Sequence, residues 1–308
     1  MYRTLVKPVV FEGVGLHGGQ KAVAKVCPAE PGRGIYFMRT DLPCSDGVIE
    51  ARYDLVSDTT LCTRLTNAEG ASVSTVEHLM AALAGCGISD ALIRIDGPEV
   101  PILDGSSMPF VTKFRRVGLT STPGIRHAIR ITNSIRVEKD GRRAALIPAV
   151  TPSLGVVISF ADRAIGTQSY ELDLTEGRFA SELADCRTFC MLSDVEALRK
   201  IGLARGGGLE NAIVVDKGRV LNPEGLRRPD EFVRHKILDA VGDLALAGAP
   251  IIGRYEGELT GHEMTNRLLH ALYANPDDWE WCEVEEGQLP GLDGPEPFPT
   301  PMPVTLAV

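Results

Sequence analysis

Two histidines and one aspartate have the residue types and the spacing of metal ligands. His235 and Asp239 lie four residues apart in the segment EFVRHKILDAVGD, so on an α-helix they share one face, one turn apart. His78 begins a second apolar segment, HLMAALAG. Two imidazoles and a carboxylate, with a fourth position open to water, are typical of a catalytic zinc site, whereas a closed structural site favours thiolates. We therefore expect His78, His235 and Asp239 to bind one zinc ion per chain.

Acid–base groups accompany these predicted ligands. Zinc lowers the pKa of a bound water toward about 7, and the adjacent carboxylate of Glu77 can accept its proton. His262 follows Gly261 at the start of the helical segment EMTNRLLHAL. If Asp243 keeps this imidazole protonated, it can stabilise an oxyanion and deliver a proton. A surface position at a helix start is the alternative interpretation of His262.

The same segments also have a purely structural interpretation. Ser74, followed by Glu77 three residues later, fits a capping box, and Gly85 fits the C-cap of the same helix. The polar stripe around His235 fits an exposed helix face with internal salt bridges. Gly242 favours the functional interpretation. A glycine in mid-helix costs about 1 kcal/mol relative to alanine, and a close approach by another segment would explain it.

The elements that must position these residues alternate along the chain. Strands are predicted at residues 5–12, 20–26, 91–96, 129–137, 155–160, 212–215 and 251–256. Helices are predicted at residues 75–84, 109–117, 193–200, 230–247 and 262–274. Each half of the chain thus carries several strands and one or two long helices. This content predicts an α+β fold, with helices packed on mainly antiparallel or mixed sheets.

Length and composition divide the chain into two domains and a tail. A chain of 308 residues is long for one core and fits two domains of ordinary size. The segment GLTSTPGIR combines Gly, Pro and Ser/Thr and marks a boundary, so we expect domains at 1–122 and 123–287. Six prolines in QLPGLDGPEPFPTPMPV predict an extended tail over residues 288–308.

Charge, hydropathy and cysteine usage restrict the partners and the location. The net charge of −9 argues against a nucleic-acid partner. No apolar run approaches the about 18–20 residues of a membrane span, and the N-terminus lacks the features of a signal peptide. Of the seven scattered cysteines only Cys186 and Cys190 are close, which is a weak metal signal. We expect a cytoplasmic protein with reduced thiols.

Several longer motifs resemble one known family. They are FEGVGLHG at 11–18, STVEHLMAAL at 74–83, PILDGSSMPF at 101–110, RTF at 187–189, NAIVVD at 211–216, FVRHKILDAVGD at 232–243 and GH at 261–262. In this order they resemble the UDP-3-O-acyl-N-acetylglucosamine deacetylases of lipid A biosynthesis. The resemblance covers roughly residues 3–275 and leaves out the Pro-rich tail.

The resemblance implies a fold and a set of residue roles. The implied fold is a pair of similar two-layer α/β sandwich domains with the active site between them. By matching motif, the resemblance implies that the zinc ligands are His78, His235 and Asp239 and that the general base is Glu77. It implies that the oxyanion is bound by Thr188 and by His262, with Asp243 as the carboxylate partner of His262. The polar substrate site is then lined by Lys236 and Phe189.

The family also has a βαβ insert in its second domain, which forms a hydrophobic passage for the fatty acyl chain. Residues 191–215 fit that insert, and Leu192, Val195 and Leu198 are the predicted lining of the passage. With their spacing of three, the same residues also fit the buried face of a short helix.

The resemblance and the residue chemistry together predict a zinc-dependent amide hydrolase. Its substrate would be UDP-3-O-(3-hydroxyacyl)-N-acetylglucosamine, and its products would be acetate and the free amine. The reaction would be the committed step of lipid A biosynthesis. Membrane-bound enzymes of that pathway would take the product. Two alternatives use the same residues: a two-His-one-carboxylate iron oxygenase, and a non-catalytic zinc-containing module that binds a sugar nucleotide. The adjacent Glu77 favours hydrolysis.

Overall fold

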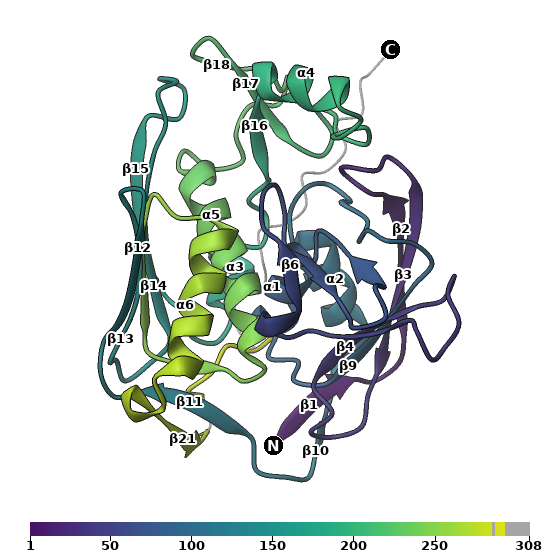
Figure 1. Ribbon diagram of the computed structural model, residues 1–308, viewed down its shortest axis with the longest axis vertical. Coiled ribbons are helices and arrows are strands. Elements are labelled where there is room, and N and C mark those ends of the chain that lie inside the picture. The colour runs from purple at the N-terminus through teal and green to yellow at the C-terminus, as the bar shows by residue number, and fades with distance from the viewer. Residues whose placement is uncertain (285–286, 293–308) are drawn as a thin grey trace, which may run out of the picture.

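The computed structural model describes residues 1–284 and 287–292, which form a mixed α/β fold with several sheets and six α-helices. Figure 1 shows two large sheets on opposite sides of the molecule, with helices between them. Residues 293–308 of the predicted tail lie outside the described part. Among the described residues, no helix combines the length and the apolar character that a membrane span requires.

The two large sheets share one strand order. The sheet of the N-terminal half consists, from edge to edge, of β2 (Val9–Val14), β3 (Lys21–Pro28), β9 (Ala91–Ile95), β4 (Ile35–Arg39) and β5 (Val48–Glu50). The sheet of the C-terminal half consists of β12 (Ile135–Lys139), β13 (Arg142–Ile147), β20 (Arg254–Glu258), β14 (Ser153–Ser159) and β15 (Thr167–Asp173). In each sheet only one pair is parallel, β9 with β4 and β20 with β14. The remaining pairs of both sheets are antiparallel.

Four helices fill the space between these sheets. They are α1 (Glu77–Gly85), α2 (Met108–Val117), α5 (Glu231–Leu244) and α6 (His262–Ala274). Helix α2 contacts β2, α5 contacts β14 and β15, and α6 contacts β12 and β13. Helices α1 and α5 pack against each other at the centre of the molecule (Figure 1). Apart from Ala84, every residue of α1 is buried, which suits its apolar sequence EHLMAALAG.

Two glycines allow close packing around α1. A Cβ atom at Gly242 would overlap the carbonyl oxygen of Glu77, so α1 lies directly on α5 at this point. The close approach predicted from a glycine in mid-helix is therefore confirmed. Gly85 has a different role from the predicted C-cap, because its missing side chain makes room for the ring of Phe179. The left-handed glycine beyond the helix end is Gly87, with φ of 75°.

Smaller elements surround this frame. They are the pair β1 (Tyr2–Leu5) and β10 (Leu119–Thr122), the sheet of β19 (Ile251–Ile252), β11 (His127–Ile131) and β21 (Trp279–Glu283), the sheet of β6 (Val56–Asp58), β7 (Arg64–Thr66) and β8 (Ser72–Val73), the sheet of β16 (Phe189–Met191), β17 (Ile213–Asp216) and β18 (Arg219–Val220), and the helices α3 (Arg178–Glu182) and α4 (Leu192–Lys200). Because β16 and β17 are parallel and α4 connects them, the segment forms a βαβ unit.

Three of the predicted strands are wrong as single elements. One is the run at 251–256, which contains β19 and the start of β20 from two different sheets, separated by Gly253. The run at 5–12 contains the end of β1 and the start of β2, which belong to different sheets. Its break includes Pro8, which has no N–H to give to a strand partner. The run at 129–137 likewise contains β11 and β12, separated by residues 132–134. Runs of apolar residues identify strand residues, but they do not show where a chain passes from one sheet to another.

Candidate metal centre

The packing of α1 on α5 brings the three predicted metal ligands together. His78 lies in the first turn of α1, and His235 and Asp239 lie one turn apart on α5. One ligand atom from each residue lies within 4.8 Å of the others, and all three residues are buried. The Nε2 atoms of His78 and His235 lie 3.5 Å and 3.3 Å from Asp239 Oδ1. The interpretation of this stripe as an exposed helix face is therefore wrong.

The carboxylate of Asp239 fits a bound cation. Its Oδ2 atom accepts a hydrogen bond from Lys236 Nζ at 2.5 Å, whereas its buried Oδ1 atom has no hydrogen-bond partner. Burial by itself would raise the pKa of Asp239, but its polar neighbours, among them the ammonium of Lys236, outweigh burial and hold the pKa well below the usual range. A buried anionic oxygen without a donor is costly, so a divalent ion between Oδ1 and the imidazoles suits this arrangement.

The tautomer of His235 also suits a metal ligand. Its Nδ1 atom lies 3.0 Å from the carbonyl oxygen of Cys186, to which it can only donate. The proton is therefore on Nδ1, and the Nε2 lone pair faces Asp239 and His78. Burial lowers the pKa of His235 to about 3, so the imidazole is neutral. Within the described part of the chain, no other group of three His, Cys, Asp or Glu side chains lies as close together, and Cys186 and Cys190 belong to no such group.

Glu77 does not form the predicted capping box. Helix α1 has Val76 as its N-cap and no side-chain capping bond. Ser74 Oγ instead accepts a hydrogen bond from Arg64 Nε at 3.0 Å, and Glu77 Oε2 accepts one from the backbone N–H of Thr63 at 3.0 Å. Burial raises the pKa of the Glu77 carboxyl. Glu77 is therefore a buried carboxylate next to His78, held by a strand-linking segment rather than by its own helix.

Asp243 and His262 form the predicted pair. His262 Nδ1 lies 2.8 Å from Asp243 Oδ2, and Thr63 Oγ1 donates to Asp243 Oδ1 at 2.6 Å. Although burial lowers the pKa of His262, the charge and hydrogen bond of Asp243 outweigh it and raise the pKa to about 9. The imidazole is therefore a cation at neutral pH, 10% exposed at its side chain.

Thr63 is a residue that the sequence interpretation missed. It is 2% exposed and contacts two carboxylates of the site, Glu77 through its backbone and Asp243 through its hydroxyl. The segment TTLCTRLTN around it has no helical or strand periodicity that marks it as functional. Its contact with Asp243 spans 180 positions in the chain, so only the fold reveals it.

The remaining predicted site residues lie around the same centre. The ring of Phe189 lies 6.3 Å from that of His235 and 5.8 Å from Lys236 Nζ. Thr188 is half-buried directly before β16, where its N–H donates to the carbonyl oxygen of Gly105 at 2.8 Å. A Cβ atom at Gly105 would overlap the carbonyl oxygen of Asn211, so this loop of the N-terminal half packs against the βαβ unit.

The three predicted passage residues lie on α4, which follows directly on β16. Leu192, Val195 and Leu198 are half-buried, and no residue of α4 is fully buried. They are therefore not the buried face of a core helix. Backbone hydrogen bonds also tie this unit to the N-terminal half, from Arg205 N–H to His17 O at 3.2 Å and from Gly206 N–H to Leu16 O at 3.0 Å.

Comparison with known proteins agrees with this geometry. The family model of the UDP-3-O-acyl N-acetylglycosamine deacetylases matches residues 2–274. The chain belongs to this deacetylase family.

Curated members of the deacetylase family resemble the chain along nearly its whole length. A UDP-3-O-acyl-N-acetylglucosamine deacetylase of Phenylobacterium zucineum is 50% identical over 280 residues, which are 91% of this chain and 96% of the relative. The protein of the same name from Myxococcus xanthus is 44% identical over 94% of this chain and 92% of its own length. That of Shewanella oneidensis is 42% identical over 99% of both chains.

Proposed function

We propose that this chain deacetylates UDP-3-O-(3-hydroxyacyl)-N-acetylglucosamine, releasing acetate and leaving a free amine, in lipid A biosynthesis. Membership of the deacetylase family supports the substrate and the reaction. The observation that carries the chemistry is the buried Asp239 Oδ1 atom, which faces two imidazole nitrogens and has no hydrogen-bond donor. That arrangement suits a metal-dependent amide hydrolase.

We infer that the metal is zinc and that one ion binds per chain, through His78, His235 and Asp239. A nitrogen-rich set of three ligands with a position left open is the usual donor set of catalytic zinc. Bound zinc would polarise the acetyl carbonyl and lower the pKa of water. The neutral state of His235 and the ionised state of Asp239 support this set, because both are the protonation states that bind metal.

We assign the proton transfers to Glu77 and His262. Glu77 is the base that takes a proton from the attacking water, and its raised pKa brings it closer to neutral pH. His262, kept cationic by Asp243, stabilises the oxyanion together with the hydroxyl of Thr188. Either Glu77, once protonated, or His262 returns a proton to the departing nitrogen. Thr63 donates a hydrogen bond to each of Glu77 and Asp243 and so links the proposed base to the partner of His262.

We also assign substrate recognition to residues beside the metal centre. Lys236 supplies a positive charge and Phe189 an aromatic face toward the polar part of the substrate. Leu192, Val195 and Leu198 are the proposed lining of the acyl passage, and their half-buried state on α4 leaves apolar surface for a chain to cover.

We propose further that the two halves of the chain are similar domains, 1–122 and 123–287, with the site between them and the βαβ unit near 191–215 inserted in the second. The shared strand order of the two large sheets supports this division. The origin of His78 in one half and of His235 in the other supports the placement of the site. We also propose a cytoplasmic location; all seven cysteines are free, as reduced thiols require.

The reaction and its substrate are tested by comparing kcat/KM for the acylated UDP-sugar and for UDP-N-acetylglucosamine. Burial of each methylene is worth up to about 0.8 kcal/mol, so loss of the acyl chain should lower kcat/KM by several orders of magnitude. A polar replacement such as Leu198→Glu should affect the acylated substrate far more than a short-chain analogue. Equal kcat/KM values for the two UDP-sugars would exclude recognition of the acyl chain.

A further inference from the structure

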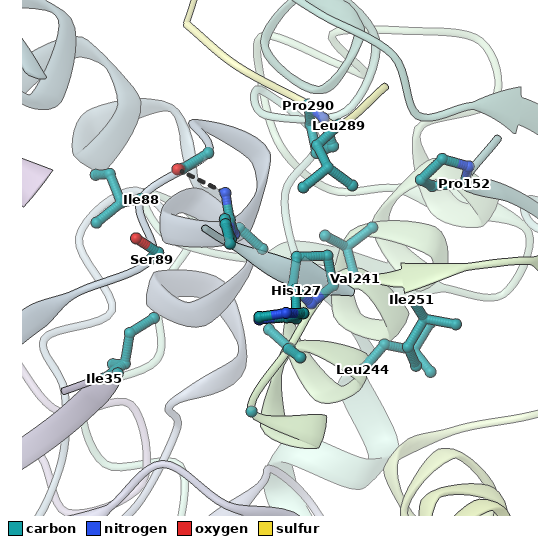
Figure 2. Close-up of a pocket in the computed structure, with 18 of the residues that line it drawn as sticks. Ile35, Ile88, Ser89, His127, Pro152, Val241, Leu244, Ile251, Leu289 and Pro290 are labelled. Carbon is teal, nitrogen blue, oxygen red and sulfur yellow. Dashed lines mark hydrogen bonds between the residues drawn. The ribbon is translucent and has the colours of Figure 1, made fainter. Parts of the chain in front are cut away.

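A cavity of about 430 Å³ lies between the two halves of the molecule, at the C-terminal ends of α1 and α5. Figure 2 shows Ile35 and Ile88 on one side of it and Leu244 and Ile251 on the other. None of the residues assigned to the metal centre, to catalysis or to the acyl passage lines it. The cavity is therefore distinct from the proposed active site.

Aliphatic side chains make up most of the cavity wall. They include Leu146, Leu154, Leu174, Val241, Leu244 and Ile251. Volumes of about 300–1,000 Å³, mostly apolar walls and a few polar groups are the usual properties of small-molecule sites. The apolar wall favours a ligand with an aliphatic part, and the charged groups of the cavity determine which polar group the ligand carries.

Two of the three arginines that line the cavity have carboxylate partners. Arg33 donates to both oxygens of Glu50, at 2.9 Å and 2.6 Å. Arg52 donates in the same way to Asp54, at 3.0 Å and 2.7 Å. The lining carboxylate of Asp90 is also satisfied, because it accepts hydrogen bonds from Gly34 N–H at 2.9 Å and from Ser89 Oγ at 2.5 Å. The hydrogen-bonding groups of Arg33, Arg52 and Asp90 are therefore already paired within the protein.

The third arginine, Arg126, has no such partner. In the described part of the chain its guanidinium forms no ion pair, and the one hydrogen bond of the guanidinium runs from Nη1 to the carbonyl oxygen of Gly87 at 3.3 Å. A guanidinium has five N–H donors, so most of its hydrogen-bonding capacity is unused. Burial lowers the pKa of Arg126 to about 10, partly opposed by Asp90, and the group remains a cation at neutral pH.

We propose that this cavity binds an aliphatic monocarboxylate. The carboxylate pairs with the guanidinium of Arg126, and the chain lies among Leu146, Leu154 and Leu244. A planar guanidinium matches a carboxylate through two parallel hydrogen bonds. A neutral lipid would leave Arg126 without a counter-charge, and a polyphosphate would need further unpaired cations that the described wall of the cavity lacks.

The two tryptophans of the chain provide a readout specific to this site. Both lie in β21, Trp281 lines the cavity, and the two rings lie 5.3 Å apart. Titration of the full chain with 10-bromodecanoate should quench their fluorescence to saturation, because bromine quenches an indole only at short range. Non-brominated hexanoate, octanoate and decanoate should displace the probe with affinities that rise by up to about fourfold per methylene.

Three variants separate the charge from the apolar wall. Arg126→Gln should weaken decanoate binding by roughly 10- to 100-fold, and Arg126→Lys should retain much of it. Arg130→Gln is the matched control: it removes a positive charge from β11, the strand that follows Arg126, outside the cavity, and should bind as the unmodified chain does. Ala249→Phe should fill the cavity and abolish quenching with Arg126 intact, while urea unfolding checks that each variant is folded.

Several outcomes would overturn the proposal. They are the absence of saturable quenching at millimolar probe, equal binding by Arg126→Gln and the unmodified chain, undiminished binding by Ala249→Phe, and equal affinity for decanoate and its uncharged methyl ester. None of these measurements depends on turnover of the UDP-sugar, so the proposed deacetylation can stand or fall separately.

Discussion

His78, His235 and Asp239 hold the metal through one atom each, so each should be indispensable. Removal of one of three protein ligands leaves a site that cannot complete its coordination. We expect His78→Ala, His235→Ala and Asp239→Ala each to lose zinc and to lower kcat/KM by at least about 100-fold. Metal analysis of the purified variants measures the loss of zinc. A variant with full occupancy and near-normal turnover would show that its residue is not a ligand.

Glu77, the neighbour of His78, should act on the chemistry and not on metal binding. In Glu77→Gln the side-chain carbonyl can still accept the hydrogen bond from Thr63 N–H, but it cannot take a proton. A positioned base contributes typically about 10²–10⁴-fold, so kcat should fall by that order while zinc remains bound. Because Glu77 forms no capping bond, the free energy of unfolding should change little. Loss of zinc together with a large loss of stability would contradict this role.

His262 should determine the alkaline side of the pH–rate profile. Its pKa lies near 9 because of Asp243, and the protonated form is the active one, so kcat should fall as the pH rises through about 9. Asp243→Asn removes the charge that keeps the proton bound. The alkaline limb should therefore move to lower pH, toward the unperturbed value of about 6.5.

A double-mutant cycle supplies the control for this pair. Asp243→Asn acts through His262, so it should cost much less activity in a His262→Gln background than in the unmodified chain. Strictly additive losses, combined with an alkaline limb that does not move, would assign the two residues to separate roles.

At the level of elements, Gly242 fixes how closely α5 approaches α1. Helix propensity alone predicts that Gly242→Ala stabilises α5 by about 1 kcal/mol. The structure predicts the opposite sign, because the added Cβ overlaps the Glu77 carbonyl oxygen and has only backbone to displace. Overpacking of this kind costs typically about 1–3 kcal/mol, and displacement of α1 also moves His78 away from His235. Urea unfolding and zinc affinity should both report a loss.

Gly97→Ala is the matched control for that substitution. A Cβ atom at Gly97 would have nothing within 4 Å, so the same chemical change should leave both the unfolding midpoint and the zinc affinity nearly unchanged. A Gly242→Ala variant that is more stable than the unmodified chain would show that α1 and α5 can separate without cost.

Local patterns predicted those parts of the site that local geometry determines. Helical periodicity placed His235 and Asp239 on one face, and the unusual glycine at 242 indicated a close neighbour. The prediction of a capping box was wrong because a Ser-x-x-Glu box requires Ser74 to be the N-cap, whereas α1 begins at Glu77. The carboxylate of Glu77 accepts its hydrogen bond from the N–H of Thr63 instead. Contacts between segments that are far apart in the sequence produce no periodic pattern of residues, so they cannot be predicted in this way.

At the level of the whole molecule, the metal centre depends on both halves of the chain. His78 comes from the helix layer of the first half, and the other two ligands come from the second. The sequence indicated an α+β composition but not the shared order of the two five-stranded sheets, because that order places the last strand of each sheet between its second and its third.

The most direct test of the central claim is acetate release from UDP-3-O-(3-hydroxyacyl)-N-acetylglucosamine by the full chain, before and after removal of metal with a chelator. We predict rapid release by the zinc-loaded chain, loss of activity after chelation, and recovery when one equivalent of zinc is returned. Glu77→Gln, loaded with zinc to the same extent, is the control for hydrolysis by the metal alone and should remain about 10²–10⁴-fold slower. Undiminished acetate release from the metal-free chain, or none from the zinc-loaded chain, would contradict the account.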